Sequence, residues 1–206
     1  MNDQHTNATN PKNATAGTYY QFMEISVREL LIEKGVLTEE DIQKAVEAMD
    51  SRGPELGAQV VARAWVDTQF KKSILQDAPL AVKTLGIDIF PLELMVVENT
   101  HKVHNLIVCT LCSCYPRTLL GLPPDWYKSR EYRSRAVSEP RSVLREFGTE
   151  IPEEVEVRVH DSTADLRYLV LPQRPAGTGH LTDDELVALV QRDSMVGVTV
   201  IPEFSG

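Results

Sequence analysis

All three cysteines of this chain lie within six consecutive positions, at Cys109, Cys112 and Cys114. The β-branched run from Val103 to Val108 comes directly before them, so we expect a strand to lead into the cysteine segment. Loops at strand ends often carry binding and catalytic groups. A disulfide framework would use an even number of cysteines spread along the chain. The crowding and the odd number therefore indicate metal ligation or redox chemistry.

The C-x-x-C-x-C spacing allows a loop that curls back on itself to point all three sulfurs at one ion. A zinc site needs four ligands, and no second cysteine pair exists, although His101 and His104 could complete a cysteine–histidine set. An iron–sulfur cluster would need a fourth cysteine, which the chain lacks. Inert buried thiols are a further alternative, but chance would not place three of them at the end of a strand.

The first 86 residues predict helices only. Residues 1–18 lack apolar periodicity, and we expect a disordered tail there. Residues 19–86 show helical spacing of apolar residues, so we expect a helical arm that wraps a partner subunit, because a single apolar stripe must be buried somewhere. The expected boundaries are a helix end at Gly35, a capping start at Thr38 with Asp41, a third helix through Val60 to Trp65, and a fourth from Asp67.

The pattern changes after Gly86 to short β-branched runs with helices between them. We expect an α+β metal-binding catalytic domain over residues 87–206, built on a mostly antiparallel sheet flanked by helices. The expected strands are 94–97, 103–108, 156–159 and 167–171, the expected helices are 124–135 and 139–147, and a last helix begins at a Thr182–Glu185 capping box.

Charge and hydropathy limit the partners. The formal net charge of −9 argues against a nucleic acid or an anionic membrane, which both require a dense positive surface. No apolar run approaches the ~20 residues that cross a bilayer, and the first twenty residues are too polar for a signal peptide. We therefore expect a cytoplasmic protein.

The run Val108 to Pro116 resembles the metal-binding signature of nitrile hydratase α subunits, and the resemblance extends over roughly residues 20–200. The matching segments are Gly57-Ala58, Ala62 to Trp65, Leu120 to Lys128, Tyr132 to Arg135, Arg167-Tyr168 and Leu171 to Thr178. The resemblance implies the fold of the nitrile hydratase α chain. It also implies hydration of nitriles to amides, with activity only in the presence of a β subunit.

The resemblance implies a trivalent metal bound by the sulfurs of Cys109, Cys112 and Cys114 and by the backbone nitrogens of Ser113 and Cys114. In the family, the residues that match Cys112 and Cys114 are oxidised to sulfinate and sulfenate. The metal is a Lewis acid toward the nitrile or activates a water, the oxygen on Cys114 is the candidate nucleophile or base, and Cys112 tunes the metal. The implied partners are a small nitrile, a β subunit in a heterodimer or heterotetramer, and an activator protein that delivers the metal.

The metal is expected to be one non-corrin cobalt(III) ion, because Thr110 and Tyr115 match the cobalt type of the signature. One non-haem iron(III) ion is the alternative, since both ions use the same protein donors and outer positions only bias the choice.

The sequence departs from the family at Arg117-Thr118, where the resemblance implies Trp-Pro. A guanidinium in the substrate pocket would attract an anion, and the γ subunit of thiocyanate hydrolase, which converts thiocyanate to carbonyl sulfide and ammonia, carries an arginine at this place. Alternatively, Arg117 pairs with a carboxylate at the subunit interface. Phe90 stands near the position of a pocket glutamine in nitrile hydratases.

Four further residues are expected at the subunit interface: Trp65, Tyr127, Arg133 and Arg135. A third hypothesis, of another class, is a non-catalytic protein that binds or delivers metal with the same cysteine segment. No residue specifically favours it.

Overall fold

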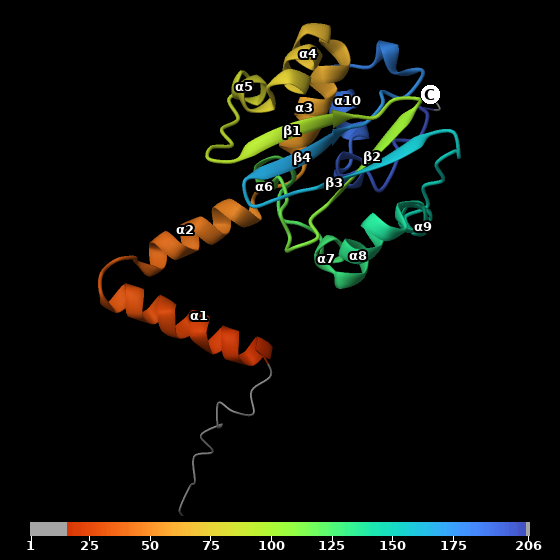
Figure 1. Ribbon diagram of the computed structural model, residues 1–206. Coiled ribbons are helices and arrows are strands. Elements are labelled where there is room, and N and C mark those ends of the chain that lie inside the picture. The colour runs from red at the N-terminus through yellow and green to blue at the C-terminus, as the bar shows by residue number, and fades with distance from the viewer. Residues whose placement is uncertain (1–15, 205–206) are drawn as a thin grey trace, which may run out of the picture. The chain divides into compact units, whose positions relative to one another are not determined.

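The computed structural model describes residues 16–204, and its internal contacts divide the chain into two units, Met1–Ala48 and Met49–Gly206. The first unit contains helix α1 (Ala16–Glu33) and most of helix α2 (Glu39–Asp50) (Figure 1). Gly35 has a φ of +66°, which suits the glycine expected to end α1. The expected tail lies outside the described residues, except that positions 16–18 begin α1.

The predicted capping start of α2 is confirmed. The hydroxyl oxygen of Thr38 accepts a hydrogen bond from the Asp41 amide at 3.1 Å, and the Asp41 carboxylate accepts one from the Thr38 amide at 3.0 Å. The two residues therefore satisfy each other's free backbone donors at the helix start.

Three further helices of the N-terminal half belong to the second unit, together with the strands. They are α3 (Glu55–Val66), α4 (Thr68–Gln76) and α5 (Ala78–Lys83). Helix α3 packs against α10, whereas α4 and α5 pack against strand β1. The division at Ala48 thus falls earlier in the chain than the expected arm boundary at residue 86.

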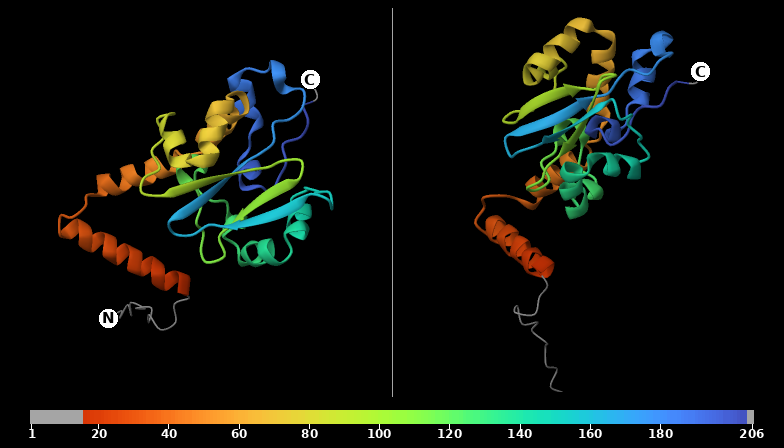
Figure 2. Two further views of the ribbon diagram at one scale, coloured as in Figure 1. Left: turned by 45° about the horizontal axis from the view of Figure 1, so that its top comes forward. Right: turned by 45° about the vertical axis from the view of Figure 1, so that its right-hand side comes forward.

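The second unit contains four strands: β1 (Glu93–Glu98), β2 (Val103–Val108), β3 (Glu156–Asp161) and β4 (Leu166–Leu171). Their positions agree with the predicted runs, and the α+β class is confirmed. The expected antiparallel pairing is wrong, because β1 pairs with β4 and β2 pairs with β3, and both ladders are parallel. Strands β3 and β4 follow each other closely in the chain, but they enter different ladders (Figures 1 and 2).

Parallel strands require a long crossover, and four helices lie between β2 and β3. These are α6 (Arg117–Leu120), α7 (Asp125–Lys128), α8 (Arg130–Ser138) and α9 (Pro140–Glu146). The chain ends with the 3₁₀ helix η2 (Thr178–His180), α10 (Asp183–Leu189) and α11 (Arg192–Val196), and the Thr182–Glu185 capping box of α10 is present as predicted.

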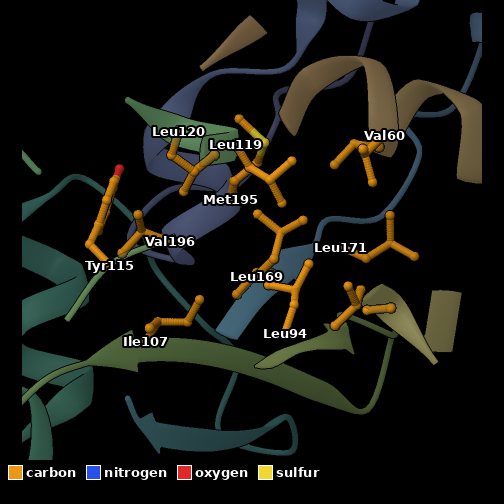
Figure 3. Packing of buried hydrophobic residues seen from close by; sticks show 14 of the residues in the cluster. Val60, Leu94, Ile107, Tyr115, Leu119, Leu120, Leu169, Leu171, Met195 and Val196 are labelled. Carbon is orange, nitrogen blue, oxygen red and sulfur yellow. The ribbon is translucent and has the colours of Figure 1, made fainter. Parts of the chain in front are cut away.

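The core lies between β1, β2 and β4 on one side and helices α3, α6 and α11 on the other. Leu106, Leu120, Leu169 and Met195 have no exposed surface, and Figure 3 shows the last three of these side chains turned toward one another. Gly197, with a φ of +90°, passes the Asn105 carbonyl so closely that a Cβ atom would collide with it. Among the described residues, no helix is both long and apolar enough to span a membrane.

Candidate metal centre

The segment from Cys109 to Cys114, called the cysteine loop below, begins directly after β2. Its three Sγ atoms all lie within 4.8 Å of one another. The Cys109 and Cys112 sulfurs are 3.5 Å apart, and those of Cys112 and Cys114 are 3.1 Å apart. All three cysteines are free thiols. The loop therefore curls back as predicted and brings its sulfurs to one point.

Backbone amides of the loop also turn toward this point. The Cys112 amide donates to the Cys109 sulfur at 3.3 Å, and the amides of Ser113 and Cys114 donate to the Cys112 sulfur. Soft sulfur donors with nearby backbone nitrogens make a set that suits one transition-metal ion. The residues present therefore fit the implied ion.

The three thiols differ in environment. Cys109 is fully buried, Cys114 is 9% exposed and Cys112 is exposed. Burial raises the pKa of the Cys114 thiol to about 12, against an opposing effect of the Arg167 guanidinium. Hydrogen bonding, first of all from the Cys114 thiol, lowers the pKa of Cys112. In the metal-free chain, the outer sulfur therefore loses its proton before the inner Cys114 sulfur.

The neighbouring strand holds the first turn of the cysteine loop. The Asp161 carboxylate accepts hydrogen bonds from the Thr110 amide at 2.9 Å and from the Thr110 hydroxyl at 2.6 Å. Asp161 is the last residue of β3 and stands beside Val108, the last residue of β2. Because the strands are parallel, their carboxyl ends meet at the same edge, and this places the carboxylate next to the loop.

Side chains from α7 and α8 hold the rest of the loop. The Tyr127 hydroxyl donates to the Cys114 carbonyl at 2.8 Å, and the Arg133 Nη1 donates to the carbonyls of Leu111 and Cys112 at 3.1 and 3.2 Å. Tyr127 has no exposed surface within this chain, and its expected role at the subunit interface stays a prediction. Its hydroxyl fixes the backbone of the metal centre.

A small pocket is lined by residues that follow the cysteine loop in the chain, among them Pro116 and Arg117, and by Glu93, Leu94 and Arg167. No ion pair involves Arg117 within residues 16–204. Phe90 is 87% exposed and does not line this pocket, whereas its neighbour Ile89 does. The single chain thus places Arg117 at the pocket and leaves Phe90 outside it.

The other residues singled out in the sequence have partners within the chain. The Trp65 indole donates to the Pro172 carbonyl at 2.8 Å, and Arg135 forms ion pairs with Glu139 and Glu146. His104 is buried and contacts the Gly197 carbonyl at 2.7 Å. Within the part of the chain that the structure describes, the candidate metal cluster at the loop contains cysteines only, so the histidine-completed zinc set is not formed.

Sequence reasoning missed Asp161 and Arg167 as neighbours of the site. Asp161 comes shortly after one predicted strand run, and Cys109 directly follows another. These two strand ends, one with a carboxylate and one with a thiol, were the sequence feature that could have indicated a shared site. The signal could be read only with parallel pairing, which brings both ends to one edge.

The fold and the site define an α+β chain that presents three thiols and two inward-facing amides to one ion. The family model for "Nitrile hydratase, alpha chain" matches residues 18–199. The low-molecular-weight cobalt-containing nitrile hydratase subunit alpha of Rhodococcus rhodochrous is 51% identical over 177 residues, which cover 85% of this chain and 86% of the relative. The chain belongs to the nitrile hydratase α-chain family.

Two other relatives bear on substrate and metal. The thiocyanate hydrolase subunit gamma of Thiobacillus thioparus is 40% identical over 193 residues, covering 88% of this chain and 79% of the relative. A solved double mutant of the Fe-type nitrile hydratase from Comamonas testosteroni Ni1 superposes with a TM-score of 0.84 at 37% identity, covering 91% of this chain and 92% of that one.

Proposed function

We propose that this chain is the metal-carrying subunit of a nitrile hydratase, which adds water to a nitrile to give an amide. The convergence of three sulfurs within 4.8 Å on one loop is the observation that carries the proposal. Membership of the nitrile hydratase α-chain family supports it. The proposed donors are the sulfurs of Cys109, Cys112 and Cys114 and the backbone nitrogens of Ser113 and Cys114.

A trivalent ion bound there would supply Lewis acidity toward the nitrile. The chain's own residues supply the rest of the site. We assign Cys114, in its sulfenate form, as nucleophile or base, and the charge of the Arg167 guanidinium acts on its sulfur. Cys112, in its sulfinate form, would tune the metal, and its exposure leaves it open to an oxidant.

Cobalt(III) is the favoured ion. The relative from Rhodococcus rhodochrous is named as cobalt-containing, and Thr110 and Tyr115 of this chain match the cobalt-type signature. Iron(III) is the alternative, and the structural likeness to an Fe-type enzyme is compatible with it. The two ions would use the same five donors, so the choice depends on residues around the loop.

A β subunit would complete the enzyme as a heterodimer or heterotetramer. Helix α1 leaves Tyr20, Phe22 and Leu30 exposed, and the exposed Leu111 lies at the tip of the cysteine loop. Exposed apolar side chains of this kind, in each unit taken by itself, support a protein interface. Trp65, Arg133 and Arg135 are proposed as neighbours of that interface. We place the enzyme in the cytoplasm, where reducing conditions keep adjacent cysteines out of disulfides.

Thiocyanate hydrolysis is the second candidate, and Arg117 is the observation that favours it. Its guanidinium lines the pocket without an ion pair in residues 16–204, and a charged substrate would supply one. The identity of 51% to a nitrile hydratase α subunit, against 40% to the thiocyanate hydrolase subunit, favours the nitrile.

The test is to purify the chain together with its β subunit, measure its metal content, and compare turnover of a small nitrile and of thiocyanate side by side. Amide formation with bound cobalt is the expected result. Release of carbonyl sulfide and ammonia from thiocyanate alone would select the second candidate. Bound metal with turnover of neither substrate would instead favour a metal-delivery protein.

A further inference from the structure

We propose that Arg133 is a positioning residue that keeps the cysteine loop in its metal-retaining shape and offsets the negative charge of the metal site. The inference rests on the proposed function, because it assumes a metal ion bound at the loop. One nitrogen of the Arg133 guanidinium, Nη1, donates to two successive carbonyls of the loop, those of Leu111 and Cys112. A single side chain therefore fixes the peptide groups on both sides of Cys112.

The helix that carries Arg133 is itself anchored to the site. The Ser129 hydroxyl caps α8 by accepting from the Tyr132 amide at 3.1 Å, and the Ser129 carbonyl accepts from the Arg133 Nε at 3.3 Å. The buried Tyr132 hydroxyl donates to the Ile107 carbonyl of β2 at 2.6 Å. The guanidinium is thus presented to the loop from a fixed point, and little side-chain freedom has to be lost when the metal binds.

The charge of Arg133 has no carboxylate partner in residues 16–204, whereas Arg135 on the same helix pairs with Glu139 and Glu146. A free cationic group therefore lies against a loop of three thiols. Within residues 16–204, the Arg133 guanidinium is the cationic group that is hydrogen-bonded to the cysteine loop. Its charge is available to balance the thiolates that a metal ion requires.

The Cys112 carbonyl, which accepts a hydrogen bond from Arg133, belongs to the same peptide group as the Ser113 nitrogen. That nitrogen is a proposed metal donor. A peptide nitrogen that binds a metal ion first loses its proton to the solvent, and resonance shares the resulting negative charge with the carbonyl oxygen. A hydrogen bond from a guanidinium to that oxygen becomes charge-assisted and stronger. Arg133 should therefore stabilise the loaded loop more than the empty one.

The test is the rate at which the purified two-subunit enzyme loses its cobalt or iron to excess chelator, followed by elemental analysis. We expect Arg133→Gln to release metal roughly tenfold faster than wild type, since a charge-assisted hydrogen bond is lost. Arg133→Lys, which keeps the charge but not the bridging geometry, should fall between them. Arg145→Gln is the control, because this exposed arginine of α9 donates to the Ser142 hydroxyl and not to the loop, and it should release metal at the wild-type rate.

The melting temperature of each metal-free chain separates this role from a general effect on folding. The three variants should melt within a few degrees of wild type. The inference would be overturned if Arg133→Gln kept its metal as wild type does, if Arg133→Gln and Arg133→Lys lost it equally, or if Arg145→Gln lost it as fast as Arg133→Gln. A wild-type enzyme without tightly bound metal would instead overturn the proposed function.

Discussion

Cys112 and Cys114 are separated by one residue, yet they face different surroundings. Cys112 is exposed, and hydrogen bonds, first of all from the Cys114 thiol, lower its pKa. Cys114 is buried, and its carbonyl accepts a hydrogen bond from the Tyr127 hydroxyl of α7. The cysteines and their convergence could be predicted from spacing alone. The roles of Tyr127 and Arg133 could not, because each depends on a backbone carbonyl, which leaves no trace in the sequence.

Replacement of Cys114 by Ser should abolish turnover without unfolding the chain. The substitution removes the proposed nucleophile and one soft donor, while the smaller hydroxyl still fits the 9%-exposed site. Activity assays of the two-subunit enzyme and a thermal melt of the same sample provide the measurement. A variant with wild-type activity would remove Cys114 from the mechanism.

Arg117→Trp should shift preference toward neutral nitriles if the guanidinium attracts an anion. Arg117 lines the pocket, and an aromatic ring there would replace a charge by apolar surface. The measurement is the ratio of kcat/KM for a nitrile to that for thiocyanate. If that ratio does not change, the arginine serves another purpose, such as pairing with a carboxylate of the β subunit.

At the level of elements, the edge where β2 and β3 end determines how the cysteine loop is supported. The strand positions could be predicted from β-branched runs, and the helix starts from capping residues such as Thr182. The pairing could not, since local patterns do not say which strands meet. Correct pairing is what reveals the Thr110–Asp161 contact.

Asp161→Ala should weaken metal retention by about tenfold or more, because groups that orient a metal-binding loop commonly have effects of that size. The substitution removes the two carboxylate oxygens that accept hydrogen bonds from Thr110. Because the position is exposed, the free energy of unfolding should fall by only about 1 kcal/mol.

Thr182→Ala is the comparison for this variant. It removes the capping box of α10, which typically costs ~1 kcal/mol of stability, but it should leave metal retention unchanged. Chelator competition and denaturant titration distinguish the two effects. Equal metal retention in both variants would show that Asp161 does not support the loop.

At the level of the whole molecule, the chain consists of a compact unit with the metal centre and a helical unit with exposed apolar residues. Tyr20 is 70% exposed and Phe22 is 56% exposed on α1, although both are large apolar side chains. The helices of the first unit could be predicted from the sequence. Their separation from α3, α4 and α5 could not, because it depends on the packing of those three helices against α10 and β1. That the first unit binds a β subunit stays a prediction, and these exposed side chains support it.

X-ray absorption at the metal edge of the intact two-subunit enzyme tests the central claim most directly. The proposed function predicts one cobalt or iron ion per chain, whose nearest neighbours include the three sulfurs that converge in the cysteine loop together with light nitrogen or oxygen atoms. A metal without sulfur neighbours, or a tetrahedral zinc in the same preparation, would contradict the account.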